Sequence, residues 1–168
     1  MSVKEHKALA PRVVRCMIVT VSDTRNEETD KSGKLIHTFL EKKDHKIAAY
    51  KIVKDELGSI QDAAEYGIQN EEIDVVLFNG GTGIASRDVT IEALTPLFDK
   101  EISGFGELFR MLSYTDDIGS GAMLSRAVAG VKDRTAIFAL PGSSGAVKLG
   151  MEKLIIPELS HVVQQLNK

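Results

Sequence analysis

The chain has 168 residues, of which 43% are hydrophobic and 27% charged, and its formal net charge is −3. This is the composition of one ordinary globular domain, and the negative charge excludes the basic surface that nucleic-acid-binding proteins present. No apolar run approaches the roughly 20 residues of a membrane span, and no signal-peptide core follows the N-terminus. Because a single cysteine, Cys16, also excludes an internal disulfide, we expect a cytoplasmic protein with no membrane partner.

The first part of the chain alternates predicted strands and helices. An apolar, β-branched run at residues 13–21 predicts a strand, and apolar residues at helical spacing predict a helix over about 33–43. A second strand is predicted over 46–53. Ser59 is a candidate cap for a helix that runs to about residue 70.

A glycine loop follows the third predicted strand. The apolar run that begins at Ile73 breaks into Gly80-Gly81-Thr82-Gly83, and Asp88 or Thr90 can cap the helix behind it. A strand, a glycine loop and a helix start together make an anion site, because unpaired N–H groups point at the ligand. The glycines alone would favour a structural turn, but the Arg-Asp-Val-Thr behind them favours a functional loop. The loop is neither a P-loop nor a G-x-G-x-x-G dinucleotide fingerprint.

The elements after this loop are shorter and richer in small residues. A helix predicted over 89–98 meets Pro96, which kinks or ends it. Residues 102–112 start with a glycine-flexed turn and become helical, and residues 114–117 predict a polar break. The small residues of 118–131 permit close packing, or form a tight turn between two elements.

The C-terminal part repeats the pattern of strand, glycine turn and helix. The strand predicted over 135–140 ends in Pro141-Gly142-Ser143, which is a second possible N–H cradle for phosphate. A closing helix is predicted over 147–166, and Pro157 implies a kink or a break within it.

The order of these elements predicts an α/β fold. Alternating strands and helices indicate a mostly parallel, doubly wound sheet. Parallel strands would bring the polar residues 22–25, the pair Asp55-Glu56 and the glycine loop to one edge, where open α/β sheets bind their ligands. No repeat or linker appears, so we expect one domain over residues 13–168, preceded by a flexible extension over 1–12.

Several short motifs occur together in a fixed order along the chain. They are Val21-Ser22-Asp23, Asp30-Lys31-Ser32-Gly33, Asp55-Glu56, Gly80-Gly81-Thr82-Gly83 with Arg87-Asp88-Val89-Thr90, Gly104-Phe105 with Glu107 and Arg110, Met123-Leu124-Ser125-Arg126 with Ala129-Gly130, and Leu140-Pro141-Gly142-Ser143. This series resembles the MogA/MoaB family of molybdenum-cofactor biosynthesis proteins, and it covers nearly the whole chain from about Val13. The N-terminal extension and the sequence of residues 106–113 are more similar to the MoaB branch than to the MogA branch.

The resemblance implies a fold, an activity and a set of site residues. The family fold is a three-layer α/β/α sandwich that assembles as trimers, or as hexamers in the MoaB branch, and active members adenylylate molybdopterin with MgATP and release pyrophosphate. The functional aspartates of the family fall on Asp55 and Asp88, which are candidate catalytic residues and candidate Mg²⁺ ligands. Its nucleotide- and molybdopterin-binding positions fall on Ser22, Asp23, Gly80, Gly81, Thr82, Gly83, Thr115, Ser125, Pro141, Gly142 and Ser143.

The residue types agree with this chemistry. Adenylyl transfer brings two negatively charged groups together, so the protein must supply N–H donors, Mg²⁺ and alignment. Glycine turns supply donors, and carboxylates supply the oxygen ligands of Mg²⁺. The four histidines lie outside every motif, so the sequence lacks a convincing pair of nucleophile and base.

Two other readings stay open. Catalytic relatives usually carry a proline after the Pro-Gly-Ser or Pro-Gly-Asn turn, whereas Ser144-Gly145 stands here. The chain could therefore be a non-catalytic oligomer that stores or delivers molybdopterin. A weaker reading is an unrelated nucleotide-binding Rossmann-like domain, which would need an acidic residue for the ribose that we cannot place.

Overall fold

The computed structural model describes residues 2–168 and is built around one six-stranded sheet. Its strand order is β2-β1-β3-β6-β5-β4, in which β2, β1, β3 and β6 run parallel while β5 and β4 are antiparallel additions at one edge. The strands are β1 (Arg15–Val21), β2 (Lys46–Val53), β3 (Val75–Asn79), β4 (Lys100–Glu101), β5 (Val128–Lys132) and β6 (Thr135–Leu140).

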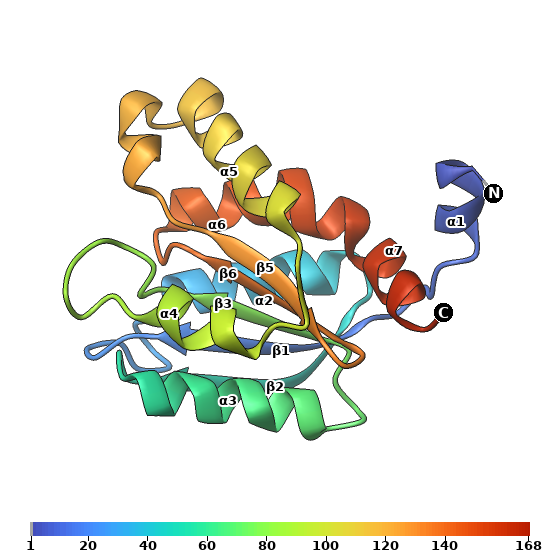
Figure 1. The fold of residues 1–168 in the computed structure, drawn as a ribbon, viewed down its shortest axis with the longest axis horizontal. Coiled ribbons are helices and arrows are strands. Elements are labelled where there is room, and N and C mark those ends of the chain that lie inside the picture. Colours follow the sequence, from blue (N-terminus) through green and yellow to red (C-terminus); the bar gives the residue numbers. More distant parts are fainter. Residues whose placement is uncertain (1) are drawn as a thin grey trace.

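Helices cover both faces of this sheet (Figure 1). They are α1 (Val3–Ala8), α2 (Lys31–Lys42), α3 (Leu57–Gln69), α4 (Thr90–Leu94), η1 (Thr95–Leu97), α5 (Ser103–Asp116), η2 (Gly119–Leu124), α6 (Ser144–Gly150), η3 (Met151–Ile155) and α7 (Ile156–Leu166). One apolar core contains residues of α2, α5, α6 and α7, and a second contains residues of α3 and α4. The predicted α/β sandwich with a mostly parallel sheet is confirmed.

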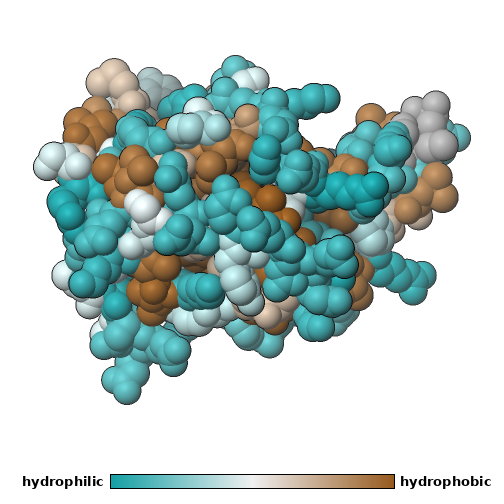
Figure 2. Space-filling model, turned by 60° about the horizontal axis from the view of Figure 1, so that its bottom comes forward, coloured by the Kyte–Doolittle hydropathy of each residue, from teal (hydrophilic) through white to brown (hydrophobic). Residues whose placement is uncertain are grey.

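The alternation of side chains along a strand explains the two cores. Ile18 of β1 belongs to the first core, whereas its neighbours Met17 and Val19 belong to the second, because successive strand residues point to opposite faces. All five residues of β3 are buried, as expected for a central parallel strand covered on both sides. The outer surface shown in Figure 2 is mostly hydrophilic, with separate hydrophobic groups.

Several predicted boundaries were wrong. Ser59 lies inside α3, and the N-cap positions of α3 and α4 are Glu56 and Val89, neither of which makes a side-chain cap. The polar break at 114–117 is absent because α5 continues to Asp116. Part of the region read as tight packing or a turn is the strand β5, which the sequence analysis missed together with β4.

Two helical segments differ from their predicted form. Residues 144–166 remain helical through α6, a π-helical segment η3 and α7, and Pro157, which has no backbone N–H to donate to the preceding turn, follows directly after η3. Within the segment predicted as a flexible extension, α1 is capped by Ser2 and joined to α7 by the ion pair of Lys7 and Glu158. Among the helices described over residues 2–168, none combines the length and apolar character that crossing a membrane requires.

Candidate functional site

The glycine loop after β3 is held tightly between β1 and α4. Gly80 and Gly81 have φ angles of +97° and +68°, which L side chains rarely adopt. A Cβ on Gly80 would also lie 2.3 Å from the carbonyl oxygen of Val21. Thr90 donates its hydroxyl to the Gly80 carbonyl at 2.8 Å and its N–H to the Gly81 carbonyl at 3.0 Å. Only glycine fits the backbone at positions 80 and 81. These two glycines and the bonds from Thr90 therefore determine the geometry of the loop.

A cavity of about 360 Å³ lies where the loops after β1, β2, β3 and β6 meet. These loops lie at the left of Figure 1, at the carboxyl ends of the parallel strands, which is the edge where open α/β sheets bind ligands. The lining residues are Val21, Ser22, Thr24, Arg25, Asp55, Gly80, Gly81, Thr82, Gly83, Asp88, Pro141 and Gly142. The structure therefore brings nine of the predicted site residues together: Ser22, Asp55, Gly80, Gly81, Thr82, Gly83, Asp88, Pro141 and Gly142.

Four predicted site residues do not line this cavity. Asp23 adjoins it through its bonds to Asp55. Ser143 lies just beyond Gly142, and its hydroxyl accepts the N–H of Ala146 to cap α6. Thr115 is an exposed residue near the C-terminal end of α5, and Ser125 directly follows η2. Thr115 and Ser125 could reach a ligand at this edge only if that ligand extended beyond the cavity.

Asp23 and Asp55 hold the loops after β1 and β2 together. The N–H of Asp23 donates to Asp55 Oδ2 at 3.1 Å, and the N–H of Asp55 donates to Asp23 Oδ1 at 3.1 Å. Arg87 adds two hydrogen bonds to Asp23 Oδ2, of 3.1 and 2.7 Å, and these bonds lower the pKa of Asp23. Burial raises the pKa of Asp55, and the negative charges of Asp23 and Asp88 raise it further. The site thus carries an excess of negative charge beside Asp55.

The two predicted catalytic carboxylates both face the glycine loop. Asp55 Oδ1 lies 2.9 Å from the position that a Cβ on Gly81 would occupy. Asp88 Oδ2 accepts the N–H of Ala85 at 3.0 Å and lies 2.6 Å from the corresponding position on Gly83. Side chains at either glycine would therefore displace the carboxylates.

The residues fit a magnesium ion that a bound substrate helps to hold. Over the described part of the chain no group of three or more His, Cys, Asp or Glu side chains forms a ready metal site. Magnesium, however, usually takes only one or two protein carboxylates and completes its shell with water and phosphate oxygens. Asp55 and Asp88 would be those two ligands, and a cation there would offset the burial and the neighbouring negative charges that raise the pKa of Asp55.

Arg25 joins the cavity to a buried polar network, and the sequence analysis gave it no role. Its guanidinium donates to the carbonyl of Gly142 at 3.0 Å and to the hydroxyl of Ser32 at 2.6 Å. It also lies 3.8 Å from Asp30, which is fully buried. Arg25 therefore fixes the turn after β6 relative to the loop after β1. Its position in the polar cluster at the end of the first strand was the available signal.

Asp30 lies at the centre of this network. Burial opposes its charge, but hydrogen bonds from Thr20, Tyr50 and the Gly33 N–H outweigh burial and lower its pKa. The hydroxyl of Ser32 donates to Asn79 at 2.6 Å, and the Asn79 amide donates to Thr20 at 2.9 Å. These bonds connect β1, β3 and the start of α2 directly beneath the cavity.

Arg126 supports the glycine loop from the other side. It donates to the carbonyl of Thr82 at 2.9 Å and to that of Gly83 at 2.7 Å, and it pairs with Glu92 at 2.5 Å. The loop carbonyls are therefore engaged by Arg126 and Thr90. Ser125 was predicted to bind the ligand, whereas its neighbour Arg126 is the residue that positions the glycine loop.

Known proteins are similar to this chain over most of its length. A family model described as "Probable molybdopterin binding domain" matches residues 17–161. A Bacillus subtilis protein named molybdenum cofactor biosynthesis protein B is 66% identical over 168 residues, which are 100% of this chain and 99% of the relative. A crystal structure of a molybdenum cofactor biosynthesis protein B has a TM-score of 0.92 at 61% identity, covering 94% of this chain and 98% of that one. The tungsten cofactor synthesizing protein MoaB from Pyrococcus furiosus has a TM-score of 0.84 at 41% identity, covering 95% and 100%.

Proposed function

This chain belongs to the family of molybdopterin-binding domains of molybdenum cofactor biosynthesis proteins, and we propose that it binds molybdopterin and adenylylates it with MgATP. In this reaction the phosphate of molybdopterin attacks the α-phosphorus of ATP, the bond to the β-phosphate breaks, and pyrophosphate leaves. The observation that carries the proposal is the cavity in which Asp55 and Asp88 face the fixed glycine loop.

The protein residues would act by positioning and by charge. The glycine loop would let the phosphates approach the backbone, because it has no side chains at Gly80, Gly81 and Gly83, and its path is fixed because a Cβ at Gly80 or Gly81 would meet Val21, Thr90 or Asp55. Arg25 adds a positive charge on the cavity wall. Aligning the two phosphate groups accounts for a large part of the rate in such transfers, in which no protein nucleophile takes part.

Magnesium would supply the charge that the protein lacks. Asp55 and Asp88 both line the cavity, so a bare triphosphate would meet two carboxylates. Bound Mg²⁺ would offset the charges of these carboxylates and of the triphosphate. We therefore infer that ATP binding depends on Mg²⁺, whereas molybdopterin binding at the glycine turns does not.

Calorimetry separates this enzyme from a carrier. MgATP titrated into the wild type should give a clear heat of binding, weakened by Asp88→Ala and abolished by EDTA, while molybdopterin should still bind with EDTA present. Asp62→Asn is the matched control, because Asp62 is exposed on α3 and outside the cavity. No heat at millimolar MgATP, even with molybdopterin bound, would contradict the proposal and leave a molybdopterin carrier.

We also propose that the chain assembles as a trimer or a dimer of trimers. The support is a set of large hydrophobic residues that a soluble monomer would leave in water: Leu108, Met111, Tyr114, Ile118, Met123 and Leu124, which are 46%, 52%, 61%, 51%, 82% and 52% exposed. They lie on α5, on η2 and, for Ile118, on the short connection between these two helices. Apolar surface gathered in this way is typical of protein contacts.

A further inference from the structure

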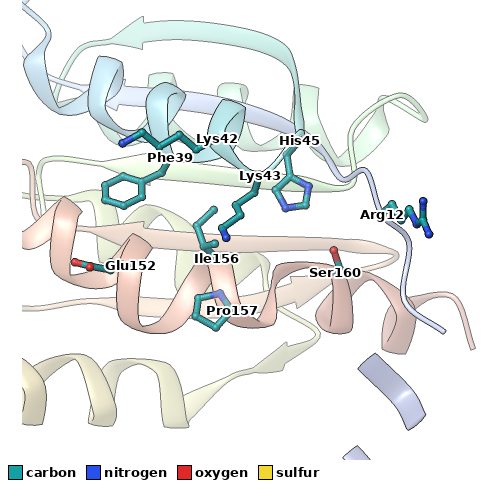
Figure 3. A pocket seen from close by; sticks show the side chains of 9 residues that line it. All are labelled: Arg12, Phe39, Lys42, Lys43, His45, Glu152, Ile156, Pro157 and Ser160. Carbon is teal, nitrogen blue, oxygen red and sulfur yellow. The ribbon is translucent and has the colours of Figure 1, made fainter. Parts of the chain in front are cut away.

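A second cavity, of about 620 Å³, lies between α2 and α7 (Figure 3). Its volume is within the range of small-molecule sites, roughly 300–1,000 Å³. It adjoins the C-terminal end of α2, whereas Ser32 at the start of α2 belongs to the network beneath the glycine loop. Phe39, the lining residue of α2 nearest to Ser32, is seven residues away, which at a rise of about 1.5 Å per residue is roughly 10 Å along the helix. The second cavity is therefore distinct from the proposed active site.

The charges around this cavity are mostly positive. Arg12, Lys42 and Lys43 line it, against the single carboxylate of Glu152. In Figure 3 the Lys43 ammonium is directed toward Ile156 and Pro157, whereas the charged ends of Arg12, Lys42 and Glu152 point away from the gap. None of these four charged groups takes part in an ion pair described within residues 2–168. The chain as a whole has a net charge of −3. The Lys43 ammonium is nevertheless a positive charge inside this cavity that an anion could meet.

His45 adds a directed donor to the same cavity. Its Nδ1 accepts the N–H of Val14 at 3.1 Å, so the neutral ring carries its proton on Nε2. Burial lowers the pKa of His45, which favours this neutral form. Figure 3 shows the ring directed into the gap between α2 and α7, with Ser160 on the facing helix. The Lys43 ammonium, the His45 N–H and the Ser160 hydroxyl are thus three donors on one cavity.

The remaining wall is apolar. The ring of Phe39, the side chain of Ile156 and the ring of Pro157 line the cavity beside these donors. Phe39 and Ile156 are only partly buried and pack against the core beneath. A hydrated inorganic ion would leave this surface in water, whereas an anion that carries an apolar group would cover it.

We propose that this cavity binds a small organic anion, a phosphate ester or carboxylate with a flat apolar body, whose charged group meets Lys43 and His45 and whose body lies against Phe39, Ile156 and Pro157. The site is independent of the proposed adenylyl transfer, since it shares no lining residue with the cavity at the glycine loop.

Phenyl phosphate and inorganic phosphate are suitable probes, and the ring signals of His45 in histidine-labelled protein report binding by NMR. His45→Gln identifies these signals. Phenyl phosphate should shift them saturably and bind at least about fivefold more tightly than inorganic phosphate, because of its apolar body. Lys43→Gln should weaken binding about tenfold or more, since a charge-assisted hydrogen bond is lost.

Lys31→Gln is the matched control, because Lys31 is an exposed lysine at the opposite end of α2. It should leave the affinity for phenyl phosphate unchanged. Unmoved His45 signals, equal affinity for the two probes, or equal affinity of wild type and Lys43→Gln would each overturn the proposal. Movement of the same signals on dilution without any probe would also overturn it, because the cavity would then be a contact between copies of the chain.

Discussion

At the scale of single residues, Asp55 and Asp88 carry the proposed chemistry. Asp55→Asn and Asp88→Asn keep the shape of each side chain but remove the negative charge that would hold magnesium. Each should lower AMP transfer by roughly a hundredfold or more, with little change in the unfolding temperature or in the affinity for molybdopterin. The measurement is steady-state turnover beside thermal unfolding, with Asp62→Asn as the unaffected control. Near wild-type kcat in both variants would remove the catalytic assignment.

The buried Asp30 predicts a dependence of stability on pH. The pKa of Asp30 is lowered in the folded protein, so its contribution is present above the unfolded pKa of about 3.9. That contribution is lost as the pH falls through the folded pKa. Tyr50→Phe removes one donor to Asp30, which should raise this pKa and lower the free energy of unfolding at pH 7 by about 1–2 kcal/mol. Urea unfolding at pH 7, 5 and 3 measures both effects.

Two outcomes decide the Tyr50 prediction. The difference between wild type and Tyr50→Phe should shrink toward pH 3, because Asp30 then begins to lose the charge that the hydroxyl stabilises. Tyr66→Phe is the control, since Tyr66 is 45% exposed on α3 and keeps its ring contact with Lys51. A Tyr50→Phe protein as stable as the wild type at pH 7 would show that the hydroxyl does not stabilise the Asp30 charge.

At the scale of elements, the start of the glycine loop after β3, at Gly80 and Gly81, should tolerate no side chain. Gly80→Ala places a Cβ 2.3 Å from the Val21 carbonyl at a φ of +97°, and should destabilise the protein by about 1–3 kcal/mol. Gly58→Ala is the matched control, because nothing lies within 4 Å of its Cβ in α3. That variant should be neutral or up to about 1 kcal/mol more stable. Thermal unfolding compares the two, and equal stability would refute the tight loop.

The elements that sequence predicted best are those with a strong local signal. β1 and β3 are mostly apolar runs, and Gly80 and Gly142 mark the turns after β3 and β6. Only the folded chain shows that these two turns are in contact, since a Cβ on Gly142 would lie 3.1 Å from the Cα of Gly80. These local signals predicted that residues 22–25, the pair Asp55-Glu56 and the glycine loop share one edge of the sheet, and the family resemblance supplied the individual site residues, nine of which line one cavity.

The elements that were missed depend on tertiary contacts. β4 has only two residues and exists through its pairing with β5, which joins Lys100 to Val131 and Glu101 to Gly130, while β5 is held by antiparallel pairing with β6. No periodicity can reveal a strand that short. Arg25 and Arg126 donate to carbonyl groups 117 and 44 residues away in the chain, and although the polar cluster after the first strand marked Arg25, no local pattern identifies the partner of either arginine.

At the scale of the whole molecule, the exposed apolar residues of α5 and η2 predict self-association. Light scattering at micromolar concentration should give the mass of a trimer or a dimer of trimers. Met123→Glu, at a residue 82% exposed in the single chain, should shift the mass toward the monomer, because it places a charge in an apolar contact. Leu57→Glu, on α3 of the opposite layer, should not. A monomeric wild type would contradict the proposed assembly.

The proposed transfer of AMP to molybdopterin can be tested directly. The purified protein is incubated with molybdopterin, ATP and Mg²⁺, and the products are identified by mass spectrometry. We expect molybdopterin that has gained one AMP, together with released pyrophosphate, and no such product with EDTA or with Asp88→Asn. Molybdopterin recovered unchanged from the wild type, while it remains bound to a folded protein, would contradict the claim.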